Sequence, residues 1–384
     1  MDVAIWAYPW DFVDGGVESS VDELAAIGVD EINLATNYHA VRSFAPDNPN
    51  RRSYFARASA YFQPNEPYGT LEPVPAEAMG DDDWVDDVAA TVAETDLSVN
   101  AWTVGCHNSR LGLANPTLTI TSPYGDSLPF GLCPSQPAVQ SYLTTLVEEL
   151  DGRDAFDRIE LEAFDYVHGS GFGWHHEKVF VERGALGEFL LGLCFCEACR
   201  ENAAAAGVDV DRARAACVTA LDAISARRLP PSLEPREWVR AHPAAEAYLR
   251  CREETLTDLF ATIRARTDSA LGYYVGLLEV GDEWLFGADL DALAEHVDYY
   301  TAIAYESSPE AAADRIRIAT ELTPGTPIHA GVHPGPSVAG DGETVREIVD
   351  AVVDAGAERV SFYNYGPLPK RSLEWIESAI DTHR

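Results

Sequence analysis

The stretch RIELEAFDY, residues 158–166, shows the pattern on which the fold prediction depends. Apolar and acidic side chains alternate along it, which places Glu160 and Glu162 on the same face of a predicted strand. Polar and aromatic residues follow where this strand ends, and most of the other predicted strands end in the same way. The eight predicted strands are residues 3–7, 31–35, 98–104, 158–163, 272–278, 299–304, 327–332 and 359–363.

Helical patterns separate these strands from one end of the chain to the other. Examples are VESSVDELAAIG at residues 17–28 and GETVREIVDAVVDAG at residues 342–356. Regular alternation of strand and helix is typical of parallel βα units. Eight such units close most simply into a barrel, so the predicted fold class is α/β, a (β/α)₈ TIM barrel forming a single domain over residues 1–384.

Long insertions are predicted after the second, third and fourth strands, at about residues 38–80, 105–135 and 165–240. Each follows the carboxyl end of a strand, where barrel enzymes build their active sites from loops. Loops of this length in a compact domain are usually functional. We therefore expect all three insertions to gather over the mouth of the barrel.

Side chains that suit a neutral, polyhydroxylated ligand stand at the predicted strand ends. Aromatic rings stack on the CH faces of sugars, while carboxylates and amides bind hydroxyl groups. A phosphate ligand is disfavoured, because the sequence shows no Gly-rich phosphate loop and no basic cluster. The predicted substrate-binding residues are Trp6, Asn37, Tyr38, His39, Trp102, His107, Asp165, His176, Tyr305, His333, Tyr363 and Asn364.

Glycoside hydrolysis needs two carboxyl groups that flank the bond to be cleaved. Glu162 is the first candidate, because it lies nearer the rim of the barrel than Glu160, which would need a buried partner. Glu306 and Glu279 each end an apolar segment and are the alternatives for the second. His176 belongs to the loop DYVHGSGFGWHHEK, residues 165–178, whose adjacent His, His and Glu do not match the metalloprotease pattern.

The charge of the chain is extreme, with 63 acidic and 27 basic residues and a net charge of −36. Such a composition resembles that of proteins from a high-salt cytoplasm, where salt screens the repulsion between acidic groups. It disfavours nucleic acid and anionic membranes as partners. The sequence shows no secretion signal and no apolar span, so we expect a soluble cytoplasmic protein, with homo-oligomerisation left open.

The stretch LCFCEACREN, residues 193–202, contains three of the seven cysteines. Their odd number and uneven spacing do not indicate a disulfide framework. A structural zinc site needs four thiolate or imidazole ligands, of which C-x-C-x-x-C supplies three. Packing as reduced thiols remains the alternative, whereas nothing in the pattern favours a redox role.

A larger block around these cysteines resembles the β-galactosidase-type barrels of glycoside hydrolase clan A. The block contains FGLCPSQPAVQSYL (residues 130–143), then the strand that ends in Glu162, then the C-x-C-x-x-C stretch. The resemblance covers residues 130–202. It implies that Glu162 is the acid/base and that a structural zinc ion is bound by Cys133, Cys194, Cys196 and Cys199.

The seventh strand departs from the family pattern, because the clan places its nucleophilic Glu at the end of this strand. Here the segment PIHAGVHPG, residues 327–335, offers His333 and no carboxylate. The leading hypothesis is a glycoside hydrolase-like enzyme that uses Glu162 as general acid/base. A metal-dependent sugar isomerase or epimerase, with Glu162, Glu279 and His333 as ligands, and a non-catalytic carbohydrate-binding pseudoenzyme are the alternatives.

Overall fold

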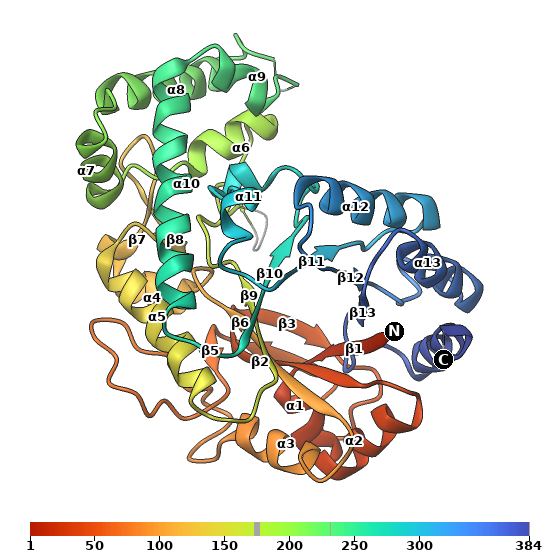
Figure 1. Cartoon of the computed structure of the whole chain (residues 1–384). Coiled ribbons are helices and arrows are strands. Elements are labelled where there is room, and N and C mark those ends of the chain that lie inside the picture. Colours follow the sequence, from red (N-terminus) through yellow and green to blue (C-terminus); the bar gives the residue numbers. More distant parts are fainter. Residues whose placement is uncertain (173–176, 231, 384) are drawn as a thin grey trace.

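The computed structural model describes residues 1–172, 177–230 and 232–383. Eight parallel strands form a closed sheet in which β1 pairs with both β13 and β2 (Figure 1). The predicted (β/α)₈ barrel is therefore confirmed. The strands are β1 (Asp2–Ala7), β2 (Glu31–Tyr38), β6 (Ser98–Val104), β9 (Arg158–Glu162), β10 (Ala270–Val275), β11 (Tyr299–Ile303), β12 (Ile328–Val332) and β13 (Arg359–Phe362).

Helices cover the outside of the barrel because each carries one apolar stripe. In α13 the buried residues Val345, Ile348, Val349 and Val352 follow helical spacing, and the Asp341 side chain caps the first turn. None of the described helices is both long and apolar enough to cross a membrane. The helices that follow the strands are α1 (Pro9–Gly15), α2 (Val17–Ala26), α3 (Trp84–Val92), α5 (Pro137–Asp151), α10 (Pro243–Arg264), α11 (Leu290–Leu293), α12 (Pro309–Leu322), α13 (Gly342–Asp354) and α14 (Lys370–Ile380).

Additional elements occupy the three segments in which the sequence predicts insertions. In Figure 1, α6 to α9 extend beyond the barrel on one side, and α10 leads back from them. That residues 1–384 form one domain stays a prediction. After β2 come β3 (Val41–Phe44), β4 (Ser53–Ala56) and β5 (Ser59–Ala60), after β6 come α4 (Ser109–Ala114), β7 (Thr119–Thr121) and β8 (Ser127–Leu132), and after β9 come α6 (Gly184–Gly192), α7 (Glu197–Ala205), α8 (Val210–Ser225) and α9 (Pro235–Arg240).

Strand β10 differs most from its predicted range. It ends at Val275 instead of residue 278, because Gly276 has a φ of +78° and turns the chain out of the sheet. The exposed segment that follows contains Glu279. This residue is therefore placed in a turn beyond the barrel rim and not at a strand end.

Charged groups are paired inside the barrel beneath its mouth. Arg359, which is 2% exposed, contacts Glu31 at 2.5 Å and Glu160 at 3.5 Å. The Asn100 amide also donates to Glu31 at 2.7 Å. Buried charges persist when they are paired and hydrogen-bonded, so this network provides the partner that Glu160 requires.

Candidate active site at the barrel mouth

An aromatic pocket of about 220 Å³ opens at the carboxyl ends of the strands. Glu162 is the one carboxyl group among the described residues that line it. The sequence predicts seven of these lining residues, and the structure brings those seven together. The lining consists of Trp6, Tyr8, Tyr38, His39, Val41, Trp102, Glu162, Tyr274, Leu277, Ile303, Tyr305 and Tyr363.

Glu162 ends β9 and receives a hydrogen bond of 2.6 Å from the Trp102 indole nitrogen on β6. Burial raises the pKa of this carboxyl to about 7, and the hydrogen bond from Trp102 opposes the rise. Nearby Asp165 and Glu160 raise the pKa further by charge repulsion. A carboxyl group with such a pKa can both hold and release a proton near neutral pH.

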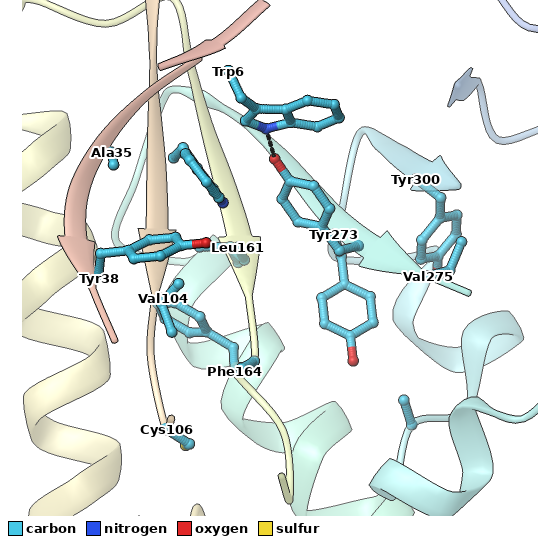
Figure 2. Close-up of a cluster of buried hydrophobic side chains, with 14 of the residues drawn as sticks. Trp6, Ala35, Tyr38, Val104, Cys106, Leu161, Phe164, Tyr273, Val275 and Tyr300 are labelled. Carbon is cyan, nitrogen blue, oxygen red and sulfur yellow. Dashed lines mark hydrogen bonds between the residues drawn. The ribbon is translucent and has the colours of Figure 1, made fainter. Parts of the chain in front are cut away.

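Hydrogen bonds beneath the pocket connect Glu160 to the pocket wall. The Trp6 indole donates to the Tyr274 hydroxyl at 2.5 Å, and this hydroxyl donates in turn to Glu160. Figure 2 shows the bond from Trp6 and the Tyr38 ring directed into the same interior space. Because Glu160 is also paired with Arg359, the pocket residues Trp6 and Tyr274 are connected by hydrogen bonds to the buried charge network.

A group of rings follows the carboxyl ends of β1, β11 and β13. Tyr305 and Tyr363 stack with centroids 5.2 Å apart, and the hydroxyls of Tyr363 and Tyr8 are 3.4 Å apart. His333 lies edge-on to Tyr305 at 5.7 Å, and its Nδ1 accepts a hydrogen bond of 3.0 Å from the Gly335 N–H. Burial lowers the pKa of His333, which favours a neutral imidazole beside the rings.

The two candidates for a second carboxylate share a single arginine. Glu306 contacts Arg315 at 2.6 Å and Glu279 contacts it at 3.4 Å. The Glu279 side chain is 74% exposed and that of Glu306 is 29% exposed. Neither is among the described residues that line the pocket around Glu162.

Other predicted binding residues lie below or beside the pocket. The buried Asn37 amide donates hydrogen bonds to the Val104 carbonyl and the Tyr142 hydroxyl. The buried Asp165 carboxylate accepts a hydrogen bond of 2.7 Å from the Tyr273 hydroxyl. Burial raises the pKa of Asp165 to about 6. Asn364 is buried directly after Tyr363.

Two histidines meet near the rim of the pocket. His107 stacks on His39 at 4.6 Å, and burial lowers the pKa of both imidazoles, that of His107 to about 3, so both rings pack as neutral groups. His176 lies outside the described residues, so its predicted contact with substrate is not addressed by the structure.

Tyr274 is a polar pocket residue that the sequence analysis missed. It lies beside Glu162 because β9 and β10 pair in parallel with Gly272 opposite Glu160. Strand alternation from Gly272 identifies Tyr274 as a residue of the same face. The prediction overlooked this signal because it considered the ends of the strands alone.

The four cysteines of the predicted metal site meet in the interior. Their sulfur atoms lie within 4.8 Å of one another, and all four residues are buried. Cys133 is 3.4 Å from Cys199 and 3.6 Å from both Cys194 and Cys196. All four are free thiols, and the backbone N–H of Thr121 donates to Cys194. This arrangement is compatible with a metal site.

No protein-family model matches the sequence, and no curated protein matches it. Solved structures do match in fold over 99% of the chain. Among them are a β-galactosidase from the psychrophilic Marinomonas ef1 (12% identity, TM-score 0.60) and one from the Antarctic haloarchaeon Halorubrum lacusprofundi (14% identity, TM-score 0.61). An α-L-fucosidase isoenzyme 2 from Paenibacillus thiaminolyticus also matches (13%, 0.56).

The chain is therefore a (β/α)₈ barrel similar in fold to these three enzymes. It spans 59% and 58% of the two β-galactosidases and 48% of the fucosidase. Identities of 12–14% show a common fold and do not transfer a substrate. The function of this barrel therefore depends on the residues of its own pocket.

Proposed function

We propose that this protein is a glycoside hydrolase-like enzyme that acts on a neutral carbohydrate, with Glu162 as general acid/base. The observation that carries the proposal is the position of Glu162, a carboxyl group in an aromatic pocket at the barrel mouth. Its pKa of about 7 keeps a proton available for the leaving oxygen near neutral pH. The rings around it provide stacking surfaces for a sugar.

We propose Glu306 as the first candidate for the second carboxylate and Glu279 as the other. Glu306 follows Tyr305, which lines the pocket, and it is the less exposed of the two. Either carboxylate has to leave Arg315 before it can act on a sugar bound beside Glu162. Substrate binding would provide the hydroxyl groups that replace this ion pair.

The first test compares glycosides with good and poor leaving groups. A dinitrophenyl glycoside needs little protonation of its leaving oxygen, whereas an alkyl glycoside needs a general acid. With Glu162→Gln, we expect kcat/KM to fall about 100-fold or more on alkyl glycosides and much less on the dinitrophenyl glycoside. Glu254→Gln, an exposed position on α10, is the matched control and should leave both rates unchanged.

Equal losses on both classes of substrate would show that Glu162 is not the acid. If the wild type binds sugars at this pocket without cleaving any glycoside, the non-catalytic pseudoenzyme takes the place of the enzyme. This alternative draws support from the single carboxyl group in the described lining. The isomerase alternative has less support, since Glu279 is paired with Arg315 and does not line the pocket that contains Glu162.

We also propose that the four cysteines bind a structural zinc ion. Zinc–thiolate bonds of about 2.3 Å in a tetrahedron separate the sulfur atoms by roughly 3.8 Å. The sulfur distances of 3.4–3.6 Å around Cys133 are close to this value. Because disulfides are rare in the cytoplasm and these cysteines are free thiols, we also propose a cytoplasmic location.

A further inference from the structure

A second pocket, of about 230 Å³, lies beside the candidate active site and is lined by three arginines. Arg51 and Arg57 flank the antiparallel strand β4, and Arg110 lies in the first turn of α4, the helix after β6. Residues 41–57 contain four arginines and one aspartate, in a chain of net charge −36. Folding adds Arg110 from a distant part of the sequence, which produces a basic site that the sequence analysis did not predict.

Two of these arginines are available to a ligand. Arg51 is neutralised by Asp14, which it contacts at 3.0 and 3.2 Å. Arg57 and Arg110 instead share one oxygen of Glu77, at 3.4 and 3.5 Å. The Glu77 side chain is 71% exposed, and long, exposed contacts of this kind stabilise little. A ligand carboxylate can therefore replace Glu77 between the two guanidinium groups.

A buried hydroxyl lines the same pocket. Tyr61 is 1% exposed, and its hydroxyl has no hydrogen-bond partner among the described residues. Arg110 is 24% exposed and donates to Ser59 at 3.1 Å, which fixes its guanidinium at the pocket. A buried polar atom without a partner is costly, and a ligand oxygen in this pocket would satisfy it.

Direct packing connects the second pocket to the candidate active site. Val41 lines the site with Glu162, Ala56 lines the arginine pocket, and the two residues face each other across the β3–β4 pair. Side chains that face each other in an antiparallel pair lie on the same side of the sheet. The two pockets therefore border the same face of the β3–β4 pair, which is the face that a ligand bound in both of them would follow.

We propose that the arginine pocket is a subsite for the anionic group of an acidic saccharide. The anion is the carboxylate of a uronic acid unit or a sulfate ester, next to the sugar unit bound at Glu162. Guanidinium groups bind both kinds of anion through paired N–H donors. This inference rests on the proposed function: the sugar unit bound at Glu162 is neutral, and the substrate is an oligomer or polymer in which an acidic unit is linked to it.

Binding measurements test this inference without requiring turnover. Calorimetry would compare trigalacturonate and an aldobiouronic acid with their methyl esters, which keep the shape and lose the charge. Inorganic sulfate would be added as a competitor to separate sulfate from carboxylate recognition. The protein would carry Glu162→Gln so that no ligand is hydrolysed, in salt that keeps it folded.

We expect at least one acid to bind about ten-fold more tightly than its ester, because a charge-assisted hydrogen bond contributes this much. Arg57→Gln and Arg110→Gln should each remove most of that difference. Arg52→Gln, an exposed arginine of the same hairpin, should keep it. Competition by sulfate would extend the recognised group to sulfate esters.

Equal binding of acids and esters would overturn the inference, as would equal losses from Arg52→Gln and Arg110→Gln. Cleavage of neutral glycosides by the wild type with no preference for acids would leave the proposed function intact. Preference for acids without any cleavage by the wild type would refute the proposed function and leave the subsite intact.

Discussion

At the residue scale, the hydrogen bond from Trp102 to Glu162 is the contact that most directly lowers the pKa of the Glu162 carboxyl. It stabilises the carboxylate and therefore lowers the pKa that burial raises to about 7. Trp102→Phe removes the donor and keeps an aromatic ring. The pKa of Glu162 should then rise by about one unit, so the alkaline limb of the kcat/KM profile should move to higher pH.

Trp10→Phe is a suitable control for this pH profile. Trp10 stacks between Tyr8 and Tyr54 at 4.3 and 4.2 Å, so the change perturbs the same aromatic cluster. The alkaline limb of the kcat/KM profile should stay at the wild-type pH in Trp10→Phe. A limb that moves to lower pH in Trp102→Phe would contradict the role assigned to the indole. Titration of the Glu162 carboxyl by carbon NMR provides the same comparison without turnover.

Residues whose positions follow from strand alternation could be predicted, and those that depend on loop geometry could not. Glu162, Trp102 and Tyr363 were found because each lies at or near the end of a recognisable strand. Glu279 was misplaced with its strand, since a glycine at position 276 continues an apolar run in sequence and still ends β10 by its positive φ. The approach of Arg57 and Arg110 depends on tertiary packing, which local sequence patterns do not show.

At the scale of elements, the eight barrel strands were predictable because strands buried on both sides appear as short apolar runs. The β3–β4 hairpin was not, because its residues alternate in a half-exposed pattern over only four positions in each strand. The sequence indicates a long insertion there and does not reveal that one of its strands borders the active-site pocket.

The cysteine cluster joins two of these insertions, since Cys133 follows β8 and the other three cysteines surround the start of α7. Purified protein should therefore contain one zinc ion per chain by mass spectrometry. Cys133→Ser should lose most of the metal and lower the unfolding temperature, because a structural metal contributes directly to folding. Cys217 is a buried thiol outside the cluster, so Cys217→Ser should keep the metal. Loss of zinc from Cys217→Ser would point to general unfolding.

At the scale of the whole molecule, the net charge of −36 dominates the response to salt. Raising KCl from 0.1 M to 1 M shortens the screening length from about 10 Å to about 3 Å. Repulsion between surface carboxylates then weakens, whereas the buried contacts of Arg359 are little affected. The unfolding temperature should therefore increase with KCl, as measured by calorimetry. An equal increase in sucrose, which screens no charge, would contradict this explanation.

The cysteine cluster also limits how this barrel can be recombined with others. Its four thiols come from excursions that leave two neighbouring strands, β6 and β9. A chimera that exchanges one of these insertions and keeps the other would separate Cys133 from its three partners. Each insertion would then bury thiols that lack the remaining ligands of the cluster. The two excursions should therefore be transplanted as a single module, and their sequences can be redesigned freely only at positions outside the shared core of sulfur atoms.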